Sequence, residues 1–139
     1  MTFVTKLLQT ENRERPVLPQ FAKFISVGLV NTLVGLGIIT GGMYFLKLNP
    51  LAANAIGYSV GIVVSFVLNG RVTFGQRSLS RMMFFRFLTV AALAYVANVV
   101  TLALLVGYNA YIAQMAGMIV YTLINFVGCR AFAFVEAND

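Results

Sequence analysis

The side chains that most often carry catalysis are scarce in this sequence of 139 residues. It contains no histidine and a single cysteine, Cys129, so no internal disulfide can form. Carboxylates, histidines and thiolates are the groups that act as general bases and hold metal ions. The four acidic residues all lie near the termini, at Glu11, Glu14, Glu136 and Asp139. We therefore expect no catalytic residue, no metal site and no cofactor.

The charged residues that do occur are mostly basic and give a net charge of +6. They gather in the N-terminal stretch and in a central loop from Arg71 to Arg86, which has four arginines and no acidic residue. A basic balance can indicate nucleic acid, but no basic side chain lies within the long apolar segments. Anionic lipid headgroups are the nearer partner, and we expect no nucleic acid.

Two uncharged segments flank this loop, at residues 48–70 and 87–129. With 60% hydrophobic and 10% charged residues, the chain has too few charges to cover the surface of a soluble domain. A charge at the centre of a bilayer costs about 3 kcal/mol, so the uncharged segments are expected inside the membrane and the loop outside it. The sequence predicts an all-α integral membrane protein.

The polar residues must be positioned by four membrane-spanning helices. A helix rises about 1.5 Å per residue and the hydrocarbon core is about 30 Å thick, so residues 87–129 are too long for one span. Gly107-Tyr108-Asn109 is the natural break there, as Asn49-Pro50 is in the first half. The expected spans are residues 24–46, 51–70, 87–106 and 110–129, between tails at 1–20 and 136–139.

Lysine and arginine also predict the orientation of these spans. The N-terminal stretch up to Lys23 has four and the central loop has four, whereas the two short turns together contain only Lys47. Because cytoplasmic loops carry the excess of basic residues, both termini and the central loop are expected in the cytoplasm. The expected location is the cytoplasmic membrane.

The two halves of the chain resemble each other. Lys23-Phe24 matches Arg86-Phe87 at a shift of 63, and after the first turn the shift drops to 60. Two apolar hairpins can align by chance, but the basic residues and phenylalanines at the helix ends match as well. The pairs that match at the shift of 60 are Ala53 and Ala113, Gly57 and Gly117, Phe66 and Phe126, Val67 and Val127, and Phe74 and Phe134. We favour a parallel repeat of two helical hairpins, with its axis along the membrane normal.

A strip of small residues runs along the second expected span at a spacing of four. Such a strip lets another helix backbone approach closely. Packing within the four-helix domain is the favoured interpretation, and contact with a second copy of the chain is the alternative. The strip consists of Ala53, Gly57, Gly61, Ser65 and Asn69, and the fourth span retains Ala113 and Gly117.

Besides Asn69 at the end of the second span, five amide side chains lie within the expected spans. Amides in membranes usually form hydrogen bonds between helices. They also offer both donor and acceptor, which suits a polar groove that binds the hydroxyl groups of a sugar. The five are Asn31, Asn54, Asn98, Gln114 and Asn125, of which Asn54 and Gln114 match in the repeat.

One basic residue lies at the cytoplasmic end of each span. These residues can anchor the helices, or they can form a ring that binds a lipid phosphate. For a phosphate role we favour Arg71 and Arg130. The set is Lys23, Arg71, Arg86 and Arg130.

Three segments resemble the GtrA-like family of small four-helix membrane proteins, and the resemblance covers roughly residues 21–135. They are F-I-S-V-G-L-V-N-T-L-V from Phe24, S-F-V-L-N-G-R-V-T-F from Ser65 and N-F-V-G-C-R-A-F-A-F from Asn125. The chain departs from the family pattern at Gly35, where an aspartate is common, and at Val72, where a tryptophan is common.

The resemblance implies a protein that is not an enzyme and that moves a polyprenyl-phosphate-linked sugar across the membrane for polysaccharide synthesis. Family members work beside a membrane glycosyltransferase, so a scaffold for that enzyme is the alternative function. A proton-coupled exporter of the small multidrug type also has four short helices. It depends on a glutamate within the membrane, and no acidic residue lies in the expected spans.

Overall fold

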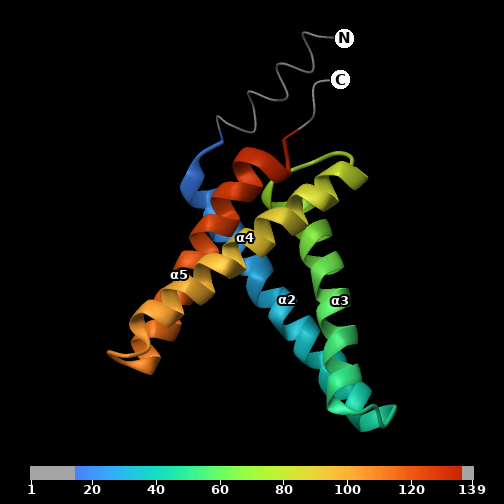
Figure 1. The fold of residues 1–139 in the computed structure, drawn as a ribbon. Helices are drawn as coiled ribbons and strands as arrows, with labels where there is room; N and C mark the ends of the chain where they lie inside the picture. The colour runs from blue at the N-terminus through green and yellow to red at the C-terminus, as the bar shows by residue number, and fades with distance from the viewer. Residues whose placement is uncertain (1–14, 136–139) are drawn as a thin grey trace. The chain divides into compact units, whose positions relative to one another are not determined.

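The computed structural model of the protein describes residues 15–135. In this part of the chain all regular structure is helical, and four helices are long and apolar enough to cross a membrane. They are labelled in Figure 1 as α2 (Val17–Phe45), α3 (Pro50–Leu68), α4 (Arg81–Leu105) and α5 (Ala110–Gly128). The expected all-α fold with four spans is confirmed. The C-terminal tail and most of the N-terminal tail lie outside the described residues.

Two of the helices begin before the expected membrane spans. α2 begins at Val17, directly after Pro16, because a proline before or within the first turn removes only an N–H that has no helical partner. α4 begins at Arg81, where the Ser80 hydroxyl accepts a hydrogen bond from the Met83 N–H at 3.1 Å and caps the helix. The end of the basic loop and the third span are therefore one continuous helix.

The other two helices continue into π-helical turns. α3 runs into η1 (Asn69–Thr73) and α5 into η2 (Cys129–Ala133). The Phe74 N–H donates to the Asn69 carbonyl at 2.9 Å, and the Phe134 N–H donates to the Cys129 carbonyl at 3.0 Å. Bonds between residues five apart define a π turn. The second and fourth spans thus extend to Thr73 and Ala133, beyond the expected ends at 70 and 129.

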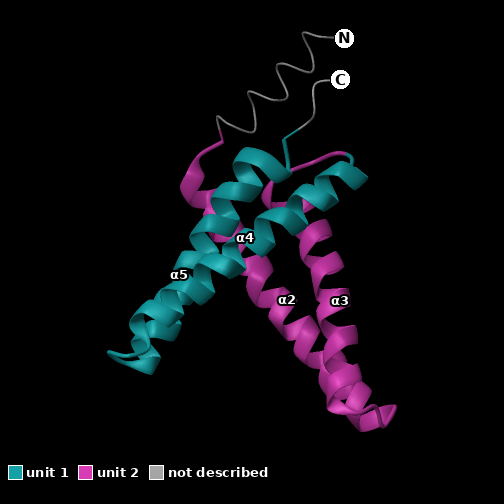
Figure 2. Cartoon of the chain, in the orientation of Figure 1, with its two compact units in different colours: residues 1–13, 78–139 teal, residues 14–77 magenta. Residues whose placement is uncertain are grey.

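The chain divides into two compact units (Figure 2). One unit, magenta in Figure 2, contains α2, α3 and η1 within residues 14–77, and the other, teal, contains α4, α5 and η2 from residue 78 on. Within each unit the two helices pack side by side and are joined by a short turn. We call them the α2–α3 hairpin and the α4–α5 hairpin. The basic end of each hairpin is the end that carries its π turn and its arginines.

The turns opposite the basic ends use the same cap. The Asn49 side chain accepts a hydrogen bond from the Ala52 N–H at 2.8 Å at the start of α3. The Asn109 side chain accepts from the N–H groups of Tyr111 and Ile112 at the start of α5. Asparagine satisfies the first unpaired N–H groups of a helix, which explains why both helices begin there. The two caps are related by the shift of 60.

The same positions are buried in both hairpins. A Cβ atom on Gly57 would lie 3.4 Å from the carbonyl oxygen of Gly35, and one on Gly117 would lie 3.3 Å from that of Asn98. Each glycine therefore lets the two backbones of its hairpin approach at the same place, and the partner carbonyls are related by the shift of 63. The buried pairs are Phe24 and Phe87, Val27 and Val90, Ala53 and Ala113, Phe66 and Phe126, and Phe74 and Phe134. The packing of each hairpin thus follows the repeat seen in the sequence, whereas the direction of the repeat axis stays a prediction.

Candidate functional site

At the basic end of the α2–α3 hairpin, four polar side chains form one buried group. The Thr73 hydroxyl donates to Oδ1 of Asn69 at 2.9 Å, and Nδ2 of Asn69 donates to the Ser65 hydroxyl at 3.2 Å. Across the hairpin, Nε2 of Gln20 donates to the Thr73 carbonyl at 3.4 Å. Gln20, Asn69 and Thr73 are each at most 3% exposed. We call Gln20, Ser65, Asn69 and Thr73 the basic-end polar cluster.

Sequence reasoning found only part of this cluster. It placed Ser65 and Asn69 on the strip of small residues, but it stopped there and left Gln20 in the tail. The strip continues to Thr73, which keeps the spacing of four through the π turn. That spacing is the signal that could have identified Thr73. Nothing in the local sequence distinguishes Gln20 from a solvated tail residue.

Further from the basic end, Asn31 lies against the backbone of α3. A Cβ atom on Gly61 would lie 3.6 Å from Oδ1 of Asn31 and 3.7 Å from its Nδ2. The Oδ1 atom is buried and has no hydrogen-bond partner among the described residues. A buried carbonyl oxygen without a partner is destabilising by about 1–3 kcal/mol. Asn31 is thus a buried acceptor that the described residues leave without a partner.

In the α4–α5 hairpin the polar side chains lie one turn further from the basic end, at the positions that correspond to Gly61, Ser65 and Asn69. Nδ2 of Asn125 lies 3.5 Å from the Tyr121 hydroxyl, and the Cys129 thiol lies 3.5 Å from Oδ1 of Asn125. Tyr121, Asn125 and Cys129 thus form one polar group that ends at the first residue of η2. Asn98 packs on Gly117 so closely that a Cβ atom there would overlap its Oδ1.

The five amides therefore divide into two groups. Asn31, Asn98 and Asn125 lie between the helices of their own hairpins. Asn54 and Gln114, which match in the repeat, are exposed on the surfaces of α3 and α5. Asn54 thus does not share a groove with Asn31 in the α2–α3 hairpin. In the α4–α5 hairpin, Gln114 does not share one with Asn98 and Asn125.

The small residues of α3 face α2. Ala53, Gly57 and Gly61 are buried, and Ser65 is half-buried. A Cβ atom on Gly57 would overlap the Ile39 side chain of α2. The strip packs against α2 inside the hairpin, so a second copy of the chain cannot contact it.

Two arginines hydrogen-bond to the backbone at the basic ends, and a third packs against it. Arg71 donates to the carbonyls of Gln76 and Arg77 in its own loop. Arg86 donates to the Val135 carbonyl at 3.1 Å and lies over the Phe132 ring, with 5.3 Å between the guanidinium carbon and the ring centroid.

The Arg15 guanidinium packs on Gly75, whose φ of +63° and lack of a side chain make room for it. Gly75 and Val135 match at the shift of 60, and each lies two residues after the end of its π turn. In each hairpin an arginine therefore lies against this residue. Of the remaining predicted cations, Lys23 is exposed and Arg130 is half-buried. Among residues 15–135, no group of three or more His, Cys, Asp or Glu could hold a metal ion.

A family model described as the GtrA/DPMS transmembrane domain matches residues 23–134. The chain belongs to this family. The match runs through both hairpins and both π turns, and it begins after Arg15 and Gln20. Together with the four apolar helices, it identifies the chain as a multi-pass membrane protein.

Two curated relatives are similar to the chain over most of its length. It is 30% identical over 110 residues to the bactoprenol-linked glucose translocase of Salmonella phage P22. It is 31% identical over 110 residues to the prophage bactoprenol-linked glucose translocase homolog of Escherichia coli K12. Each alignment covers 79% of this chain and 82% of the relative. No solved structure matches the chain significantly.

Proposed function

We propose that this protein translocates a polyprenyl-phosphate-linked sugar across the cytoplasmic membrane and carries out no chemical transformation. The observation that carries the proposal is the similarity to two proteins named for the translocation of bactoprenol-linked glucose, over about four fifths of both chains. The buried amides support it physically. A sugar head can cross hydrocarbon only if its hydroxyl groups find polar partners, and amides between helices provide donors and acceptors there.

In this mechanism the lipid phosphate binds at the basic ends, and the sugar contacts Asn31, Asn98 or Asn125. The polyprenyl tail stays outside the helices, in lipid. None of the described helices contains an acidic residue, so a proton-driven cycle on a buried carboxylate has no group to use. Synthesis of the substrate on one side and its consumption on the other provide the gradient. The cations proposed for phosphate are Arg71 and Arg130. Lys23 and Arg86, which match each other in the repeat, complete the proposed set.

Three further partners belong to this proposal. Anionic headgroups attract the basic loop on the cytoplasmic face. A membrane glycosyltransferase makes or uses the lipid-linked sugar. A second copy of the chain remains a candidate partner for the exposed helix faces, since the strip of small residues is already covered inside the hairpin.

Transport by the purified protein tests the proposal directly. Liposomes are prepared with polyprenyl-phosphate glucose in both leaflets, and external periodate oxidises only the sugars of the outer leaflet. With the protein present we expect all of the sugar to be oxidised, whereas about half stays protected in protein-free liposomes. Protection of the same half in both samples would contradict translocation and favour the scaffold function.

Charge removal tests the phosphate role. Arg71→Gln and Arg130→Gln keep hydrogen bonding and remove the charge. The loss of a charged contact costs about 1.5–3 kcal/mol, so affinity for the lipid should fall more than tenfold. Arg77→Gln is the matched control, because it removes the same charge from the same loop. If all three variants insert normally and bind alike, the arginines only anchor the helices.

The proposed orientation is tested by labelling. A cysteine at position 49 or 109, in a chain that carries Cys129→Ala, should react with an impermeant maleimide added from outside the cell. The basis is the excess of lysine and arginine at the other ends of the spans. Reaction of both positions only from the cytoplasmic side would reverse the topology.

A further inference from the structure

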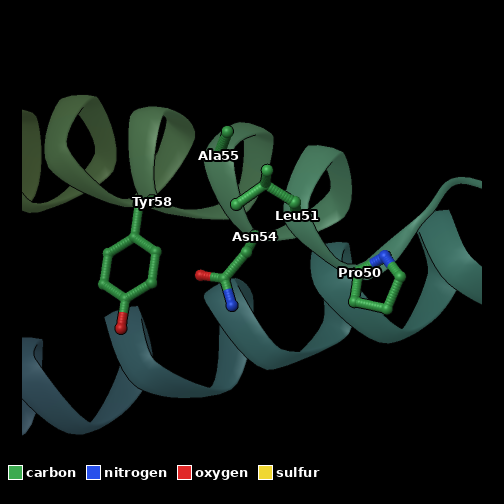
Figure 3. A pocket seen from close by; sticks show the side chains of 5 residues that line it. All are labelled: Pro50, Leu51, Asn54, Ala55 and Tyr58. Carbon is green, nitrogen blue, oxygen red and sulfur yellow. The ribbon is translucent and has the colours of Figure 1, made fainter.

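A shallow hollow lies on the exposed surface of α3, near the end opposite the basic end (Figure 3). It is wide open, because α3 alone provides its lining. The lining residues are Pro50, Leu51, Asn54, Ala55 and Tyr58.

Two polar side chains stand side by side at this hollow. Asn54 and Tyr58 are one helical turn apart, and in Figure 3 both extend to the same side of α3. Tyr58 is 69% exposed, and Asn54 is also exposed. Neither side chain forms a hydrogen bond with another described residue. Both side chains are therefore open to a polar ligand.

The other hairpin differs at this surface. At the shift of 60, Asn54 corresponds to Gln114, which retains the amide. Ala55 and Tyr58 correspond to Met115 and Met118, both more than 60% exposed. Long methionine side chains thus occupy the surface that Ala55 leaves open, and the phenol is absent. The hollow with its amide and its phenol belongs to the α2–α3 hairpin.

We infer that this hollow binds the sugar of the lipid-linked substrate at the end of the span opposite the phosphate-binding arginines. An amide offers donors and an acceptor to neighbouring hydroxyl groups, and a phenol adds a hydroxyl and an aromatic face for the sugar ring. The inference rests on the proposed function. With the orientation proposed above, the hollow lies at the outer face, so it receives the sugar after passage and holds it before release.

Binding measurements with two lipids test this site. The probes are polyprenyl-phosphate glucose and polyprenyl phosphate without sugar, titrated into the full chain in nanodiscs. Ala55→Met fills the hollow as Met115 does in the other hairpin, and Asn54→Leu removes the amide without loss of volume. We expect each variant to lose part of the parent's preference for the glucose lipid and to bind the bare lipid as well as the parent does. Ala92→Met, which adds the same atoms at an exposed position on α4, should leave both affinities unchanged.

The remaining outcomes separate the site from the function on which it rests. If the parent prefers the glucose lipid but both variants retain that preference, the proposed function stands and this site is wrong. If the variants lower the affinity for both lipids equally, these positions affect the fold or the binding of the polyprenyl tail, and the site is again wrong. If Asn54→Leu converts a dimer into a monomer without affecting sugar preference, the surface is a contact between copies. If the parent itself shows no preference for the glucose lipid, the proposed substrate and this site both fail.

Discussion

In the α2–α3 hairpin the buried polar side chains reach the basic end, whereas in the α4–α5 hairpin they stop further from it. Asn69 and Thr73 of the first hairpin correspond to Cys129 and Ala133 of the second, and all four are buried. The glycines, the phenylalanines and the π turns correspond in both. Since the second hairpin packs without an amide or a hydroxyl at these two positions, packing does not require them. The basic-end polar cluster is therefore particular to the α2–α3 hairpin, and its role can be tested by removing it.

The strongest test of the shared packing is to add a side chain where the backbones touch. Gly57→Val would push into Ile39 and Gly117→Val into Asn98. Overpacking typically costs about 1–3 kcal/mol, so each variant should lower the free energy of unfolding by that amount. The measurement is unfolding in mixed micelles, followed by circular dichroism. Gly37→Val is the control, because a Cβ atom there has nothing within 4 Å. If only one of the two variants lowers the free energy of unfolding, the two hairpins are not packed in the same way.

The second test transfers the polarity of one hairpin to the other. The double variant Asn69→Cys and Thr73→Ala gives the α2–α3 hairpin the residues of the α4–α5 hairpin. Hydrogen bonds inside membranes contribute about 0.6 kcal/mol on average, so unfolding should become easier by only about 1 kcal/mol. Transport in the periodate assay should nevertheless fall several-fold. Unchanged transport in a correctly inserted variant would mean that the cluster is only structural.

The smallest expected effect concerns the caps. Asn49→Ala and Asn109→Ala each remove the side-chain acceptor at the start of a helix, at a cost of about 0.5 kcal/mol where water can replace it. Asn109 should be the more costly of the two, because it accepts two hydrogen bonds and Asn49 accepts one. Thermal melting of both variants in detergent measures the difference. A larger loss at Asn49 would show that the two turns are not equivalent.

The fold could be predicted from the sequence because hydropathy and charge determine which segments enter a membrane. The close approach of α2 and α3 at Gly57 was also accessible, since small residues at a spacing of four leave room for a backbone. The hydrogen-bond partners of Arg71 could not be predicted from the sequence. Its side chain turns back to carbonyls of its own loop, and their position depends on how the chain leaves the π turn. The start of α2 at Val17 was missed because Pro16 and Pro19 resemble a break, although prolines fit the first turn of a helix.

The paired π turns also carry information about history. A π turn holds one residue more than an α turn, so a helix acquires one when a single residue is inserted and accommodated. Asn69–Thr73 and Cys129–Ala133 occupy corresponding positions in the two hairpins. Two independent insertions at one corresponding place are a less economical history than one insertion that was later copied. The shared position is what a duplication of one hairpin that already ended in a π turn would leave.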